Sequence, residues 1–174
     1  MKKKFTLALL VSIISLKSIA QLDGTLAPFY YGVASGDPAK NKVTIWTHVT
    51  PTNPLASSVK VTWRMATDTN FENVVASGTA HAKIADDFTV KVNVTGLQPG
   101  AWYYYQFMAL NKYSLTGRTY TLPTGKNVDS VRMAVFSCAS YQTGFFNAYQ
   151  EVVNLNDVDV VLHLGDWIYE YGVG

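Results

Sequence analysis

The stretch Val158–Gly174 constrains the fold of this chain more than any other. An apolar run, Val158–Leu164, leads directly into Gly165-Asp166, and Tyr169 follows three residues after the aspartate. A run rich in β-branched residues that ends in Gly-Asp is typical of a buried strand with a carboxylate at its carboxyl end. In α/β sheets, ligands bind at that edge. We therefore expect this stretch to supply half of a metal site.

The segment before it predicts a matching strand and a helix. Val131–Phe136 is a nearly continuous apolar run, as in the strands of a parallel sheet. A helical apolar stripe follows at i, i+4, i+7 and i+8, and Asn156-Asp157 can end that helix. Its members are Phe145, Tyr149, Val152 and Val153. Strand, helix and strand together predict a βαβ unit with a right-handed connection.

Cys138 and Asp166 each follow one of these two strands. Neighbouring parallel strands lie about 4.8 Å apart and end at the same sheet edge. A thiolate and a carboxylate there can share one metal at ligand distances of about 2.0–2.3 Å, and Tyr169 can add a phenolate oxygen. Such an anionic set favours ferric iron over magnesium. His163, inside the strand, is expected to be a core histidine or a residue that supports the ligands.

The chain has a single cysteine, so three interpretations of Cys138 stay open from composition alone. It can be an inert buried thiol, a partner in an intermolecular disulfide, or a metal ligand. Asp166 after a glycine can also simply shape a turn or cap a helix.

Short strands separated by turn residues predict a β-sandwich in the first part of the chain. Runs with strand character occupy residues 29–34, 43–49, 59–65, 71–76 and 88–94, and turn signals recur about every 8–12 residues. The segment Leu97-Gln-Pro-Gly-Ala-Trp-Tyr103 resembles the corner of fibronectin type III modules, where a tyrosine hydroxyl bonds to the upstream backbone. Tyr103 would take that role.

The strand after this corner carries aromatic residues on both faces. Tyr103, Tyr105 and Phe107 share one face. Trp102, Tyr104 and Met108 share the other. One face must be core. The other is expected to pack against the next domain, with a sugar-binding platform as the alternative.

The first twenty residues have the pattern of an export signal. Lys2-Lys3-Lys4 precedes an apolar run, and Ser18-Ile19-Ala20 predicts cleavage before Gln21. The signal has no twin arginine, which favours the Sec route and a location in the periplasm, cell envelope or medium. Removing its four lysines leaves ten basic residues against 12 acidic ones, which excludes the basic surface expected of a nucleic-acid-binding protein.

Three separated motifs resemble one known family. They are Gly165–Gly172 (GDWIYEYG), Phe136–Ala139 (FSCA) and Tyr31–Pro38 (YGVASGDP), with Ile45–Thr47 and Gly117–Thr121 fitting the same sandwich. Together they are similar to the PhoD family of secreted alkaline phosphatases and phosphodiesterases. These have a calcineurin-like metallophosphoesterase domain behind a small β-sandwich. The resemblance implies an all-β fibronectin III/Ig-like sandwich followed by the first βαβ unit of an α/β metallophosphoesterase domain.

The resemblance also implies a metal centre and a reaction. Cys138 stands where ordinary metallophosphoesterases have Asp-x-His on the first strand. Asp166 matches the carboxylate that bridges two metals, and Tyr169 matches the phenolate ligand of iron. The implied cofactors are ferric iron and calcium. The implied activity is hydrolysis of phosphate mono- or diesters by a metal-activated hydroxide.

The implied domain organisation is a signal peptide over residues 1–20, a β-sandwich over 27–123, a linker over 124–130 and the truncated start of a metallophosphoesterase domain over 131–174. The further histidine and aspartate ligands of the family would lie beyond Gly174. We therefore expect an N-terminal fragment that is inactive by itself. The alternative is an extracellular adhesion or sugar-binding sandwich without catalysis. The sequence leaves the substrate and the oligomeric state open.

Overall fold

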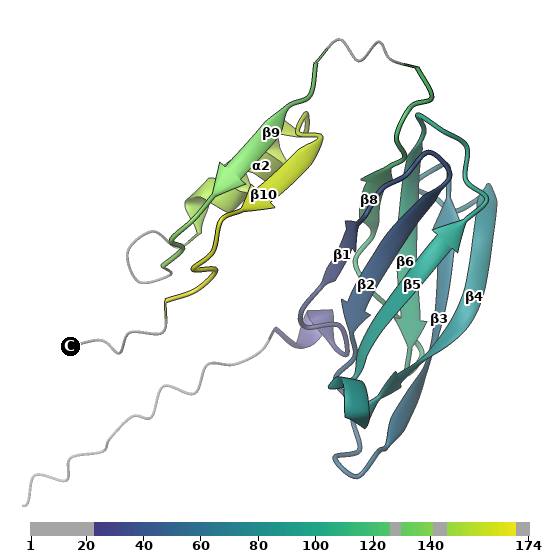
Figure 1. Ribbon diagram of the computed structural model, residues 1–174. Coiled ribbons are helices and arrows are strands. Elements are labelled where there is room, and N and C mark those ends of the chain that lie inside the picture. The colour runs from purple at the N-terminus through teal and green to yellow at the C-terminus, as the bar shows by residue number, and fades with distance from the viewer. Residues whose placement is uncertain (1–22, 126–129, 141–145, 170–174) are drawn as a thin grey trace, which may run out of the picture.

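A computed structural model describes residues 23–125, 130–140 and 146–169 of the chain. It contains a β-sandwich and a smaller strand–helix–strand segment (Figure 1). None of the helices in these ranges is both long and apolar enough to cross a membrane. The expected signal peptide, residues 1–20, lies outside the described residues, as does most of the expected linker.

The sandwich is built from two antiparallel sheets. The first has the order β1-β2-β5, with β1 at Val33–Gly36, β2 at Lys42–His48 and β5 at Thr89–Thr95. The second has the order β4-β3-β6-β7, and β8 also pairs with β6. Its strands are β3 (Ser58–Ala66), β4 (Val74–Lys83), β6 (Trp102–Ala109), β7 (Lys112–Tyr113) and β8 (Gly117–Tyr120). Two short 3-10 helices, η1 (Gly24–Leu26) and η2 (Ile84–Asp86), flank the strands.

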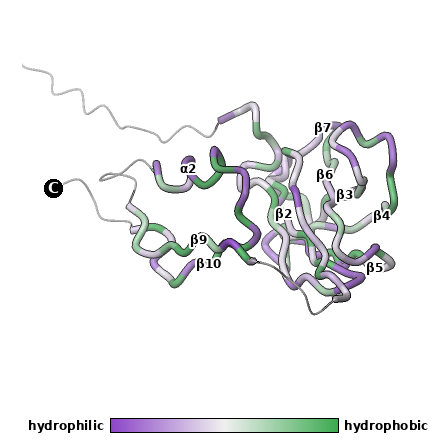
Figure 2. Tube along the Cα trace, turned by 90° about the horizontal axis from the view of Figure 1, so that it is seen from above, coloured by the Kyte–Doolittle hydropathy of each residue, from purple (hydrophilic) through white to green (hydrophobic). Residues whose placement is uncertain are grey.

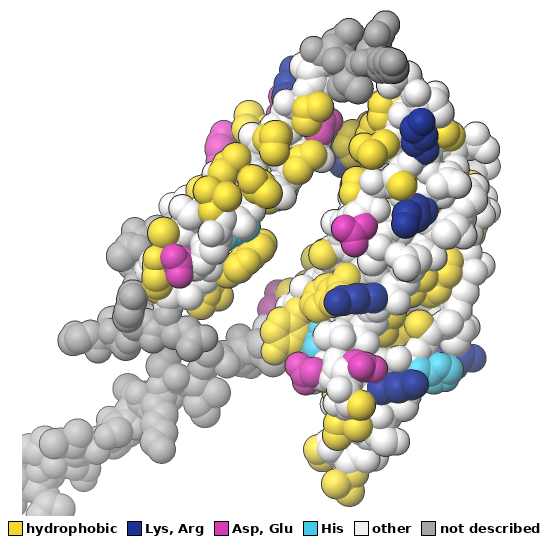
Figure 3. All heavy atoms as spheres, viewed as in Figure 1, with side chains coloured by type: hydrophobic (Ala, Val, Ile, Leu, Met, Phe, Trp, Pro, Cys, Tyr) yellow, Lys and Arg dark blue, Asp and Glu magenta, His cyan; other side chains and the backbone are white. Residues whose placement is uncertain are grey.

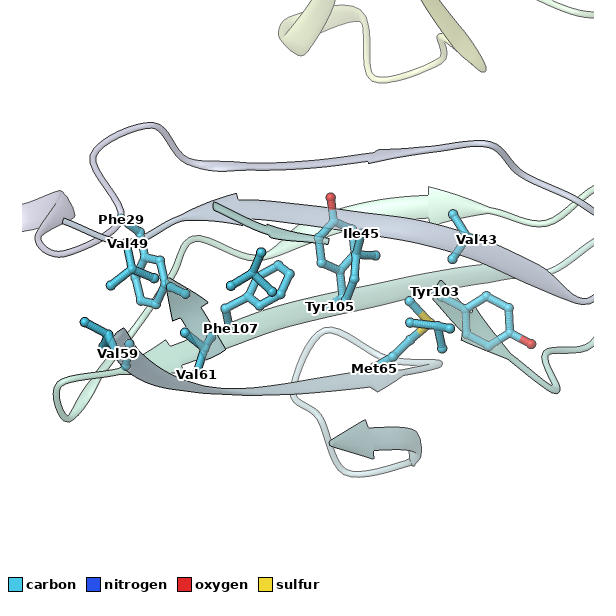
Figure 4. Close-up of a cluster of buried hydrophobic side chains, with 14 of the residues drawn as sticks. Phe29, Val43, Ile45, Val49, Val59, Val61, Met65, Tyr103, Tyr105 and Phe107 are labelled. Carbon is cyan, nitrogen blue, oxygen red and sulfur yellow. The ribbon is translucent and has the colours of Figure 1, made fainter. Parts of the chain in front are cut away.

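The hydrophobic core lies between the two sheets. Alternate residues of each strand point inward, so β2, β3 and β6 each bury every second side chain along much of their length. Figure 4 shows these side chains meeting between the layers. Full burial of each large apolar side chain contributes about 1.5–3 kcal/mol. The largest apolar members are Phe29, Val43, Ile45, Val49, Val61, Met65, Val94, Tyr105 and Phe107.

The tyrosine corner is confirmed. Tyr103 is 2% exposed, and its hydroxyl accepts a hydrogen bond of 2.8 Å from the backbone N–H of Gln98. The division of β6 into two faces is confirmed as well. Tyr105 and Phe107 are buried with Tyr103, whereas Trp102, on the other face, is 39% exposed.

Two expected strands have different bounds in the structure. The strand expected over 29–34 begins only at Val33, because Phe29 belongs to a turn and its ring fills the core. The strand expected over 71–76 begins at Val74 and continues to Lys83. Phe71 has a left-handed backbone (φ 59°) and lies in a turn that Asp68 closes. The carboxylate of Asp68 accepts backbone N–H bonds from three of the next five residues, which also lowers its pKa.

The strand–helix–strand segment comprises β9 (Met133–Phe136), α2 (Asn147–Leu155) and β10 (Val160–His163). Strands β9 and β10 pair in parallel, with Val160 opposite Met133 and His163 opposite Phe136. Figure 2 shows hydrophobic residues along both strands and along α2. Arg118 of β8 donates a 2.8 Å hydrogen bond to Asn156, just after α2, which links this segment to the sandwich.

The expectation of buried strands is wrong for the described residues. Val135 is 55% exposed on β9, and Leu162 is 43% exposed on β10. Among the described residues, α2 is the one α-helix that packs on this two-stranded sheet, and one helix cannot cover both faces. Val153, expected in the buried stripe of the helix, is 68% exposed, whereas Tyr149 and Val152 are half-buried. Phe145, the first member of that stripe, lies outside the described residues.

Candidate metal centre

The two parallel strands continue as a backbone ladder beyond their ends. Leu164 N–H donates to the carbonyl of Phe136 (2.8 Å), and Cys138 N–H donates to the carbonyl of Gly165 (3.3 Å). Ala139 N–H then donates to the carbonyl of Asp166 (2.9 Å). These bonds hold the segment after β9 against the segment after β10.

This ladder brings Cys138 and Asp166 together. The Sγ of Cys138 lies 3.8 Å from Oδ2 of Asp166, in a thiol-to-carboxylate hydrogen bond. Both residues are exposed rather than packed into the core. The interpretation of Cys138 as an inert buried thiol is therefore wrong.

Both residues also have strained backbones. The φ angle of Cys138 is 57° and that of Asp166 is 53°, in the left-handed region that residues other than glycine rarely adopt. Each such residue costs on the order of 1–3 kcal/mol, and such strain clusters at functional sites. Gly165, with a φ of 118°, has a conformation open only to glycine. The two strained residues and Gly165 lie in the two adjoining turns that follow β9 and β10.

Tyr169 joins the same pair of side chains. Its backbone N–H donates to the carbonyl of Ala139 (3.0 Å), which folds the segment after Asp166 back over the end of β9. Hydrogen bonding to Cys138, followed by desolvation and by the hydrogen bond and charge of Asp166, raises the pKa of the Tyr169 phenol well above its ordinary value. Anionic neighbours have this effect, and a cation among them would reverse it.

The donor set fits a single metal ion. A metal bound to a sulfur and a carboxylate oxygen can span at most about 4.4 Å between them, from typical ligand distances. The 3.8 Å between Cys138 Sγ and Asp166 Oδ2 is shorter than this limit. Across the described ranges, no three or more His, Cys, Asp and Glu side chains gather at one place. Tyr169 is thus the additional oxygen donor that the described residues bring to this pair.

A pocket of about 200 Å³ opens beside Cys138, between the end of β9 and the start of α2. Ser137, Cys138 and Ala139 line one side, and Asn147 and Tyr149 line the other. The first amides of a helix have no acceptor within it, so the start of a helix attracts anions. An anionic group bound in this pocket would lie next to Cys138, at the same edge of the sheet.

Sequence reasoning missed the partners of His163. Its Nε2 lies 2.9 Å from the hydroxyl of Tyr149, and its ring stacks on Trp167 at 3.9 Å. The signal in the sequence is the position of Tyr149 on the apolar stripe of the helix, but such a stripe predicts packing and not a hydrogen bond. The two sandwich histidines, His48 on β2 and His81 on β4, belong to other strands and do not join the centre.

Comparison with known families decides the classification. The family profile described as "PhoD-like phosphatase, N-terminal domain" matches residues 16–123, and that described as "PhoD-like phosphatase" matches residues 133–174. The chain belongs to the PhoD-like phosphatase family. The family resemblance drawn from the three sequence motifs is thereby confirmed.

Individual relatives agree with the family assignment. The chain is 41% identical over 152 residues to alkaline phosphatase D of Bacillus subtilis (strain 168), an alignment that covers 83% of the chain and 26% of that relative. The chain thus spans about a quarter of the length of this curated relative. The solved structure of PhoD matches it with a TM-score of 0.77 at 38% identity, over 86% of the chain and 30% of that structure. This match confirms the β-sandwich fold.

Proposed function

We propose that the protein carrying this chain is an exported, metal-dependent phosphoesterase that hydrolyses phosphate mono- or diesters. The observation that carries the proposal is the convergence of Cys138 and Asp166 at one sheet edge, 3.8 Å apart, in a member of the PhoD-like phosphatase family. The proposed domain arrangement is a sandwich over 27–123, a linker over 124–130 and the start of the phosphoesterase domain at 131.

Cys138, Asp166 and Tyr169 would hold the metal. The thiolate and the two oxygens form an anionic set suited to ferric iron, and family resemblance adds calcium as a second ion. Bound metal would polarise the phosphoryl group and activate water for attack on phosphorus. The two strained turns fix the direction of Cys138 and Asp166 before any metal binds, which lowers the cost of ordering the site.

The pocket beside Cys138 supports binding of a phosphoryl group. Its wall includes Asn147, the first residue of α2, where helix amides attract anions. An ester bound there would lie next to the proposed ligand Cys138.

Metal analysis tests the proposed centre. The purified protein that carries this chain is expected to contain iron in a fixed molar ratio. It should also show a visible charge-transfer absorption from its thiolate and phenolate ligands. Cys138→Ser should lose both signals and phosphodiester hydrolysis, while Ser77→Ala, at an exposed serine on β4 of the sandwich, should keep all three. Unchanged metal content and hydrolysis in Cys138→Ser would refute the assignment and favour a binding module without catalysis.

Export through a cleaved signal is a separate part of the proposal. It rests on the three lysines, the apolar run and Ser18-Ile19-Ala20. N-terminal sequencing of the protein recovered from the periplasm or medium is expected to begin at Gln21. A start at Met1 in the recovered protein would contradict the cleavage.

A further inference from the structure

Four ring-bearing side chains pack together behind the proposed metal centre. Phe136 comes from β9, Tyr149 from α2, His163 from β10, and Trp167 from the segment after Asp166. The rings of Phe136 and Tyr149 meet edge to face at 4.7 Å, and those of His163 and Trp167 stack at 3.9 Å with 13° between their planes. The imidazole of His163 thus lies between the helix and the turn that carries Asp166.

The hydrogen bonds of His163 define its tautomer. The backbone N–H of Gly165 donates to Nδ1 (3.3 Å), so Nδ1 carries no proton. The ring proton of the neutral imidazole is then on Nε2, which donates to the hydroxyl of Tyr149 at 2.9 Å. Both ring nitrogens have partners, and the two partners belong to different elements.

The peptide groups around Gly165 are therefore held on both sides. The N–H of Gly165 is bound by His163 of β10, and its carbonyl accepts from the N–H of Cys138 after β9. Gly165 immediately precedes Asp166, and rotation about its backbone would swing the Asp166 carboxylate away from the Cys138 thiol. At a φ of 118° the glycine has no side chain to restrict that rotation.

We propose that His163 is a positioning residue for the metal centre: its Nδ1 fixes the Gly165 peptide and thereby directs the Asp166 carboxylate toward Cys138. This inference rests on the proposed metal centre and extends it. Tyr149 holds the imidazole through Nε2, so α2 transmits its position to the Asp166 turn. A residue that serves only to pack between the helix and Trp167 would not need an acceptor at the Nδ1 position.

Two conservative substitutions separate these roles. The Oδ1 of asparagine reaches the position of Nδ1, whereas the amide of glutamine reaches that of Nε2. In His163→Asn the acceptor for Gly165 is kept and the contact with Tyr149 is lost. In His163→Gln the contact with Tyr149 is kept and the acceptor for the Gly165 N–H is lost. A pure packing role predicts equal effects of the two changes.

The first measurement is amide hydrogen exchange of Gly165 in metal-free protein. His163→Gln should speed the exchange of this amide about fivefold, as expected when a hydrogen bond worth about 1 kcal/mol is lost. His163→Asn should leave it near the wild-type rate. Equal exchange rates in the two variants would overturn the proposal, whether or not the protein binds metal.

The second measurement is titration with Co²⁺, followed by the thiolate charge-transfer absorption. Residues that orient metal ligands typically change affinity 10–100-fold when replaced. We expect that loss for His163→Gln and a loss of less than about threefold for His163→Asn. His81→Gln, an exposed histidine on β4, is the matched control and should bind Co²⁺ like the wild type.

The two measurements distinguish failure of this inference from failure of the proposed function. No Co²⁺ binding by the wild type would refute the metal centre, while the Gly165 exchange rates would still decide whether His163 holds that peptide. Co²⁺ binding that is weakened equally in both His163 variants would keep the centre and overturn the positioning role.

Discussion

The buried hydroxyl of Tyr105 makes the stability of the sandwich depend on alkaline pH. Tyr105 lies in the core and is 2% exposed. Burial raises the pKa of its phenol from 10.0 to about 12, partly offset by a hydrogen bond with Ser35. The folded protein therefore keeps this proton over a pH range in which the unfolded chain loses it.

The magnitude follows from the size of this shift. Each pKa unit corresponds to about 1.4 kcal/mol, so a shift of about two units is worth at most about 2.7 kcal/mol. Because the folded-state pKa is the higher one, the full contribution is present below about pH 10 and is lost as the pH rises through about 12. At about pH 11, roughly half of it, about 1.4 kcal/mol, is gone.

Urea unfolding followed by tryptophan fluorescence measures this effect. Between about pH 8 and pH 11, the wild type should lose about 1.4 kcal/mol more unfolding free energy than Tyr105→Phe. Tyr31→Phe is the control, because Tyr31 is 68% exposed and has little burial to lose. Equal losses in the wild type and Tyr105→Phe would refute the reasoning.

Three further predictions concern the described residues. Tyr103→Phe removes the hydroxyl that binds Gln98 and should cost about 1 kcal/mol in urea unfolding; an unchanged midpoint would contradict a role for the corner in stability. Gly117→Ala places a Cβ 2.2 Å from Cζ of Tyr105 and should cost about 1–3 kcal/mol or more, and wild-type stability would show that the ring can move aside. Leu162 belongs to the exposed apolar face over β9 and β10 (Figure 3). Leu162→Glu should reduce binding of a hydrophobic dye with little change in sandwich stability, and undiminished dye binding would mean that this face is not the dye site.

Periodicity predicted the parts of the fold where side chains alternate between core and solvent. Strands β2 and β6 alternate along their whole length and β3 alternates over its first half, so their positions and faces followed from the sequence. The pairing of Cys138 with Asp166 was also predictable, because adjacent parallel strands end at one edge. The geometry places these two side chains together, while their role as metal ligands stays a prediction.

The remaining features depend on contacts that a sequence window does not contain. Strand β4 continues through small residues of low strand propensity because β3 pairs with it along its length. Position 78 requires a glycine, because the ring of Trp63 lies 2.8 Å from where a Cβ would be. The bond between Tyr149 and His163 joins residues 14 positions apart and depends on how α2 packs on the sheet.

The proposed centre is formed by residues close in sequence, which affects how cooperatively the chain unfolds. Its two closest side chains are 28 residues apart in sequence and are joined through β9, α2 and β10, whereas β2 and β5 of the sandwich pair Lys42 with Thr95. Segments that share few contacts open as separate units, each with its own free energy. The exposed hydrogen bond between Arg118 and Asn156 links the sandwich to the strand–helix–strand segment and is too weak to make the two unfold together. We therefore expect a calorimetric scan to show two transitions, with the centre lost at the lower temperature while the sandwich remains folded.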